Sequence, residues 1–106
     1  MYKLFVFCPD DEKIIFSIIE AASGAGAGFL GNYSHTCFLT KGTGNWKSEE
    51  GSNPTIGKVG ELSHEPEVRI EMLCTEGKAK SVKEAIKSVH PYEEPEIDFV
   101  KLMDIE

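Results

Sequence analysis

The stretch EPEVRIEMLC, residues 65–74, alternates polar and apolar side chains with a period of two. Successive side chains of a β-strand point to opposite faces, so this pattern predicts a strand with one polar and one apolar face. The polar face carries Glu65, Glu67, Arg69 and Glu71, and the apolar face carries Val68, Ile70, Met72 and Cys74.

The residues that follow this strand predict a helix and a last strand. The helix is expected over residues 79–90, with a capping-box pattern at Ser81 and Glu84 and with Pro91 preventing its continuation. Apolar residues within 97–103 predict the last strand. The apolar stripe of the helix consists of Val82, Ala85, Ile86 and Val89.

The residues that precede this strand predict three further elements and an arm. Residues 2–8 are almost continuously apolar, which predicts a central strand buried on both faces. A helix is expected over residues 11–23, where acidic residues precede isoleucines at helical spacing. Aromatic and β-branched residues predict another strand over 33–40. The glycine-containing segment 41–64 predicts an extended hairpin arm with an irregular tip.

The resulting element order is β-α-β-β-α-β, which is the order of an α+β ferredoxin-like sandwich. This fold has a four-stranded antiparallel sheet with both helices on one face, and the 106 residues are expected to form one such domain. The second sheet face has no cover of its own, yet the first strand carries apolar residues on both sides, with Tyr2, Leu4 and Val6 on one and Phe5 and Phe7 on the other. A further copy of the chain is the simplest cover, so we expect a homo-oligomer.

Charge and cysteine use limit the possible partners and compartment. The formal net charge of −7 disfavours nucleic acid and anionic membranes as partners. No apolar stretch approaches the roughly 20 residues that a membrane span requires, and the N-terminal residues resemble a strand more than a signal peptide. The three cysteines are far apart and lie in apolar runs, which favours free thiols in a reducing cytoplasm.

Three segments carry a family resemblance that covers almost the whole chain. They are GNY at 31–33 with Phe38 and GTG at 42–44, GKVGEL at 57–62 with EPEVRIE at 65–71, and HPYEEP at 90–95. Their order and spacing resemble the middle domain of YqfO-type proteins, the NGG-interacting factor three family, in a stand-alone form. That domain is similar to the CutA and PII signalling proteins, so the resemblance implies a trimer. In full-length family members a flanking domain holds a pair of metal ions, and hydrolase or GTP cyclohydrolase activity is sometimes attached to the family. This sequence is not expected to include that flanking domain, so the resemblance brings no catalytic residues.

The segment HPYEEP contains the best candidate for a ligand site. His90, Tyr92, Glu93 and Glu94 place an imidazole, a phenol and two carboxylates at a helix end, and we add Glu65 as a further ligand-binding candidate. These groups suit a cation or a polar ligand. The alternative is structural: His90 would interact with the helix dipole, Pro91 would end the helix, and Tyr92 would pack against the fold.

A second, weaker candidate is a soft-metal site at His35 and Cys37. Both residues would point from the same face of the strand predicted over 33–40. Two ligands are a weak signal, and a core thiol beside a hydrogen-bonded histidine is the favoured alternative.

Four further residues are candidates for an interface between subunits. If another chain covers the open sheet face, the charges of Glu67, Arg69 and Glu71 must be paired there, because an unpaired buried charge is costly. If that face is wet, they are ordinary surface charges. Trp46, in the arm, is either a partner or ligand contact or a residue packed beneath the arm.

The leading functional hypothesis is a non-catalytic oligomeric module of the PII or CutA type that binds a small ligand or a divalent metal ion between subunits. The ligand and any cofactor cannot be named from the sequence. The second hypothesis is a protein-interaction module in which the arm embraces a neighbour. The third is a metal-dependent hydrolase, which only the family name motivates.

Overall fold

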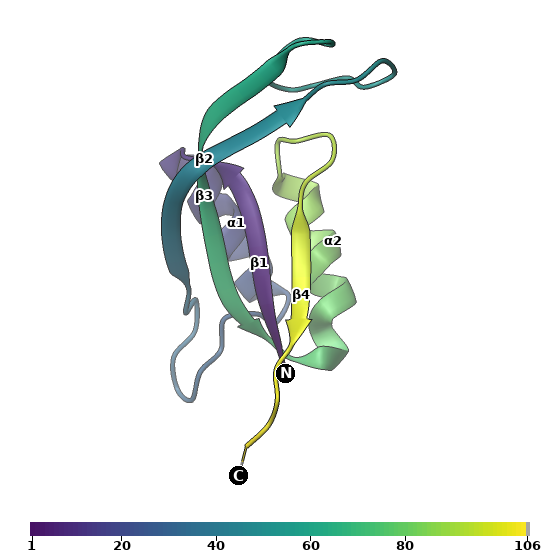
Figure 1. The fold of residues 1–106 in the computed structure, drawn as a ribbon. Coiled ribbons are helices and arrows are strands. Elements are labelled where there is room, and N and C mark those ends of the chain that lie inside the picture. Colours follow the sequence, from purple (N-terminus) through teal and green to yellow (C-terminus); the bar gives the residue numbers. More distant parts are fainter. Residues whose placement is uncertain (106) are drawn as a thin grey trace.

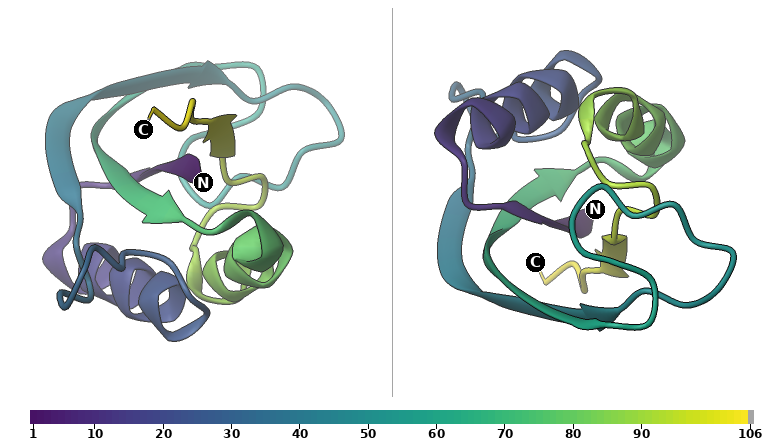
Figure 2. Two further views of the ribbon diagram at one scale, coloured as in Figure 1. Left: turned by 90° about the horizontal axis from the view of Figure 1, so that it is seen from below. Right: turned by 90° about the horizontal axis from the view of Figure 1, so that it is seen from above.

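The fold is a four-stranded antiparallel sheet in the order β2-β3-β1-β4. The computed structural model describes residues 1–105. Both helices lie on the same side of the sheet, as Figures 1 and 2 show. The predicted ferredoxin-like order is therefore confirmed. The elements are β1 (Tyr2–Pro9), α1 (Glu12–Gly24), β2 (Phe38–Lys47), β3 (Leu62–Cys74), the short 3₁₀ helix η1 (Glu76–Lys78), α2 (Ala79–Val89) and β4 (Ile97–Lys101).

The core lies between the helices and one face of β1 and β3. The predicted apolar face of β3 is fully buried there, together with Leu4, Val6 and Cys8 of β1. Phe5 and Phe7 are only half-buried, so the prediction that β1 is buried on both faces is wrong for the single chain. The reason is that both helices cover the same side. The helices contribute Ile15, Ile18, Ile19, Ala22, Val82 and Ile86 to the core.

The two helices begin differently from one another. Asp11 caps α1, where its side chain accepts hydrogen bonds from the amides of Lys13 and Ile14, as its acidic start predicted. α2 instead continues directly from η1 and already begins at Ala79. Ser81 therefore lies inside α2, and the predicted capping box does not form.

The arm is a long two-stranded ribbon formed by β2 and the first part of β3. Its register runs from Phe38 opposite Glu71 to Lys47 opposite Leu62. The predicted strand over 33–40 is therefore misplaced, because residues before Phe38 form an irregular loop in which His35 has a positive φ of 57°. In Figure 1 the arm extends past the other strands and bends toward the α2–β4 loop, residues 90–96.

No helix within residues 1–105 has both the length and the apolar character needed to cross a membrane.

Candidate ligand-binding site

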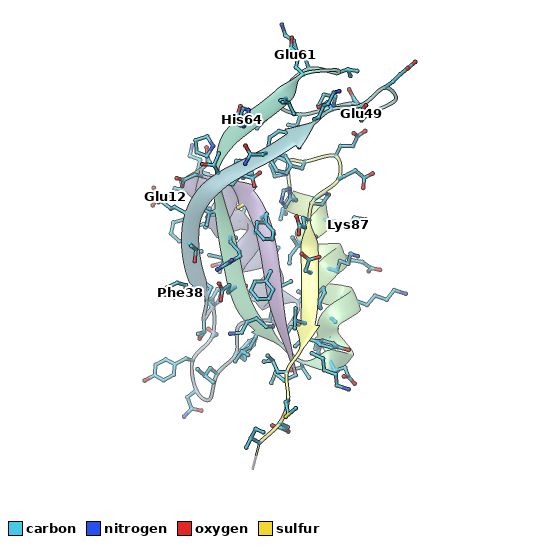
Figure 3. The ribbon with its side chains drawn as sticks, in the orientation of Figure 1. Glu12, Phe38, Glu49, Glu61, His64 and Lys87 are labelled. Carbon is cyan, nitrogen blue, oxygen red and sulfur yellow. The ribbon has the colours of Figure 1, made fainter. Side chains whose placement is uncertain are left out.

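A cavity of about 430 Å³ lies where the arm bends over the α2–β4 loop. β1 and β3 supply Phe7 and Glu67 to its wall, and the arm supplies Trp46. Figure 3 shows the arm bending toward the α2–β4 loop, with Glu49 near the far end of the arm. Further wall residues come from the arm loop, residues 48–61, and from the α2–β4 loop; the latter supplies Tyr92, Glu93, Glu94 and Glu96.

Two hydrogen bonds fasten the arm loop to the α2–β4 loop. The amide of Asn53 donates to Oε1 of Glu93 at 3.0 Å, and Oγ1 of Thr55 donates to the carbonyl oxygen of Pro91 at 2.7 Å. These partners are 40 and 36 residues apart in the sequence. The cavity is therefore held together by tertiary contacts between two loops of the same chain.

Trp46 and Tyr92 form the aromatic part of the cavity wall. Their ring centroids are 5.8 Å apart with an interplanar angle of 58°, and both side chains are half-buried. Tyr92 also packs against His90, and the centroids of these two rings are 5.1 Å apart. Trp46 thus contacts the α2–β4 loop of its own chain, which places it at the cavity; its predicted role in an interface between subunits stays a prediction.

Tyr92 and Glu67 are joined by a short hydrogen bond. The Tyr92 hydroxyl donates to Oε2 of Glu67 at 2.7 Å. Burial raises the pKa of Tyr92, and the hydrogen bond to Glu67 raises that pKa further, so the phenol stays protonated at neutral pH and acts as a donor. The Glu67 carboxylate lies over Gly44, where an added Cβ would overlap it. A glycine on the paired strand therefore makes room for this side chain.

His90 has a structural role at the end of α2. Its Nε2 lies 2.8 Å from the carbonyl oxygen of Phe7, and its Nδ1 accepts a hydrogen bond from the amide of Tyr92 at 3.1 Å. This pair of bonds assigns the Nε2–H tautomer and occupies both ring nitrogens. Burial lowers the pKa of His90, which favours the neutral ring. Of the predicted ligand-binding candidates, His90 therefore positions Tyr92 and offers no free nitrogen to a ligand.

The other predicted ligand-binding candidates lie at or beside the cavity. Tyr92, Glu93 and Glu94 belong to its wall. Glu65 lies opposite Gly44 in the β2–β3 register, and its negative charge contributes to the raised pKa of Tyr92. Three of the five predicted residues thus belong to the cavity wall, although contact with a ligand stays a prediction.

The predicted soft-metal pair does not share a strand face. His35 and Cys37 both precede β2, and the two ring nitrogens of His35 lie 2.9 Å from Oγ of Ser34 and 3.3 Å from Oε2 of Glu20. Cys37 is half-buried against the core, and burial raises the pKa of its thiol. Within residues 1–105, no three His, Cys, Asp or Glu side chains converge in a manner suited to a metal ion.

Arg69 and Glu71 pair with each other on the open sheet face. Nη2 of Arg69 lies 2.9 Å from Oε1 of Glu71, and the guanidinium lies 5.8 Å from the ring centroid of Phe5. Their charges are therefore compensated within one chain. Glu67, the third charged interface candidate, instead points to Tyr92 and the cavity.

Sequence patterns did not identify Phe7 or Glu96 as site residues. Phe7 comes from the far end of β1, and Glu96 precedes β4. The interaction of Glu96 with the Asp98 carboxylate raises the pKa of Glu96. The alternation of β1 put Phe5 and Phe7 on the same side of the strand, but only the tertiary structure shows that this side is open and that the bend of the arm brings Phe7 into a cavity.

Comparisons with known proteins agree with this architecture. Residues 58–106 match the family described as CutA1 divalent ion tolerance protein. The chain is 47% identical, over 102 residues, to a protein of Halalkalibacterium halodurans called GTP cyclohydrolase 1 type 2 homolog, covering 96% of this chain and 27% of that protein. A crystal structure of a Bacillus cereus protein related to NIF3 has a TM-score of 0.82 at 35% identity, covering 97% of this chain and 26% of that one.

The chain is homologous, over almost its whole length, to a part of these NIF3-related proteins. The resemblance seen in the three sequence segments is therefore confirmed. This CutA1-like domain spans about a quarter of the length of the NIF3-related relatives that it matches. The divalent cation tolerance protein CutA1 of Thermus thermophilus has the same fold, with a TM-score of 0.71 at 17% identity over 99% of this chain and 86% of that one.

Proposed function

We propose that this CutA1-like domain is a non-catalytic, self-associating module that binds a small ligand between its arm and its α2–β4 loop. The cavity of about 430 Å³ carries the proposal, because it is within the size range of small-molecule sites, about 300–1,000 Å³. Its wall combines the aromatic pair Trp46 and Tyr92 with several carboxylates. Apolar surface with a few oriented polar groups is typical of such sites.

Self-association is supported by the uncovered sheet face. Phe5 and Phe7 are half-buried on the side away from the helices, and the edge strand β2 begins with the exposed Phe38. A homo-oligomer, with the trimer that the family resemblance implies, would bury this surface and bring neighbouring cavities close to subunit boundaries. We also propose a cytoplasmic location, which the three free thiols support.

Native mass spectrometry of the untagged protein tests the proposal in one measurement. We expect a trimer that retains additional small-molecule mass, and this mass should be lost on denaturation. A bare monomer at micromolar concentration would contradict both the assembly and the ligand site. A bare trimer would favour the second candidate, an assembly module in which the arm loop, residues 48–61, contacts a neighbour.

A divalent metal ion is the alternative ligand, and the CutA1 family description supports testing it. Glu93 and Glu94 offer the oxygen ligands that hard cations prefer. Calorimetric titration with magnesium, calcium and manganese would detect it. The hydrolase hypothesis rests on the name of a relative of which this chain covers 27%. A GTP turnover assay, with and without metal, tests it on this chain.

A further inference from the structure

The charges around the cavity are predominantly negative. Five carboxylate side chains belong to its wall, against the single ammonium group of Lys47. That ammonium group lies 3.9 Å from Oε1 of Glu49, so its positive charge offsets the negative charge of one of the five carboxylates. The molecule as a whole carries a formal charge of −7, so its field also attracts cations. The five carboxylates are those of Glu49, Glu67, Glu93, Glu94 and Glu96.

Glu67 is the carboxylate whose environment is most informative. It is half-buried and fixed in place by the Tyr92 hydroxyl and by the close approach over Gly44. Among residues 1–105, no lysine, arginine or histidine nitrogen lies within 4.0 Å of it. Burying a carboxylate is costly, and a cationic partner offsets that cost better than a neutral donor does.

The aromatic residues distinguish an organic cation from a metal ion. Trp46 and Tyr92 line the same cavity as Glu67, and aromatic ring faces attract ammonium and guanidinium groups while also covering the attached carbon atoms. A metal ion requires several converging oxygen or nitrogen ligands, and the described residues contain no group of three that meets this requirement.

We propose that the ligand of this cavity is a small organic cation, whose ammonium or guanidinium group pairs with Glu67 while its apolar part lies against Trp46. This inference rests on the proposed function, because it names the ligand class of the same cavity. The volume of about 430 Å³ accommodates a charged head group together with a short carbon chain.

Calorimetric titration with matched four-carbon probes tests the ligand class. The probes are n-butylammonium and n-butylguanidinium, with n-butanol as the neutral analogue and n-butyrate as the anionic one, all at one ionic strength. We expect at least one cation to bind at least tenfold more tightly than n-butanol, and n-butyrate not to bind. Equal affinity for n-butanol and both cations would overturn the organic-cation assignment but leave a ligand site in place.

Two variants assign the interaction to individual residues. Glu67→Gln should weaken binding of the cation at least tenfold, whereas Glu12→Gln, the same charge change far from the cavity in Figure 3, should have no effect. Trp46→Leu keeps an apolar wall and removes the indole, so it should weaken cation binding more than n-butanol binding. Circular dichroism spectra and unfolding midpoints verify that each variant is folded.

The proposal and the function on which it rests fail in different ways. If native mass spectrometry finds a retained small molecule but no cationic probe binds, the ligand class is wrong and the ligand-binding function stands. If no mass is retained and no probe of any charge binds, both are wrong. An equal loss of affinity in Glu67→Gln and Glu12→Gln would also overturn the assignment of the cation to Glu67.

Discussion

The hydroxyl of Tyr92 donates a 2.7 Å hydrogen bond to Oε2 of Glu67 and thereby joins the α2–β4 loop to the open face of β3. The two residues are separated by 25 positions in the sequence. Because His90 positions the Tyr92 amide through a second hydrogen bond, the end of α2 and the cavity wall form one connected unit.

Replacing Tyr92 by phenylalanine should destabilise the protein by about 1–2 kcal/mol, because the half-buried Glu67 carboxylate would lose its neutral donor. The free energy of unfolding in urea measures this change. Tyr33→Phe is the matched control: its ring is 75% exposed, and the substitution should change stability by less than about 0.5 kcal/mol. Equal effects of the two substitutions would contradict the importance of the Tyr92–Glu67 bond.

Gly44→Ala should disturb the cavity, because the new Cβ would overlap the Glu67 carboxylate and displace it from Tyr92. The backbone of Gly44 has no positive φ, so the effect comes from this contact. The fluorescence of Trp46, the single tryptophan, reports the change. Gly42→Ala is the control, since an added Cβ there meets no atom within 4 Å. An unchanged emission spectrum in Gly44→Ala would show that Glu67 does not occupy this position in solution.

Stability should fall as the pH drops below about 6.5 because of His90. Burial lowers its pKa in the folded state, so the unfolded chain binds the proton more tightly. The contribution of His90 to the free energy of unfolding is therefore complete at pH values above its unfolded-state pKa. This contribution is lost as the pH falls from the unfolded-state pKa through the lower folded-state pKa. Unfolding midpoints between about pH 7.5 and about pH 5.5 measure this loss.

The variant His90→Gln should show a weaker pH dependence than the wild type over the same range, because the titrating ring is gone. His35→Gln makes the same substitution at an exposed histidine and should leave the dependence as it is. The assignment to His90 fails if both variants retain the slope of the wild type.

Thr55→Val should release the arm loop from the α2–β4 loop. The substitution keeps the shape of the side chain and removes the hydroxyl that donates to the Pro91 carbonyl. Amide hydrogen exchange at Asn53 should accelerate about fivefold to tenfold, in line with the loss of about 1 kcal/mol of local stability. Thr43→Val, on the exposed part of β2, is the control, and an identical exchange rate in both variants would contradict the role of Thr55.

The sequence predicted the elements whose patterns reflect burial against the helices. β3 alternates as expected, and α1 follows the predicted isoleucine stripe with Asp11 as its cap. β2 was misplaced because its exposed, glycine-containing residues carry no burial pattern. Its position is set by pairing with β3, which is a long-range property.

The sequence predicted several residues of the candidate site correctly, but it did not predict what each residue does there. The segment HPYEEP does lie at a cavity, and Tyr92 and Glu93 belong to the cavity wall. His90 is not part of the wall; its ring holds the Tyr92 amide and the Phe7 carbonyl oxygen in place. Glu67 was expected at an interface, and its partner Tyr92 could not be inferred, because their contact depends on how α2 ends relative to β3.

The sequence by itself determined the order of elements, the two faces of β3 and the family resemblance, because hydrophobic periodicity and short motifs are local properties. Only the tertiary structure decided the length and bend of the arm, the pairing of Tyr92 with Glu67 and the existence of the cavity. Each of these depends on residues that are far apart in the chain, and their contacts form only when strand register and helix packing fix the distances between them.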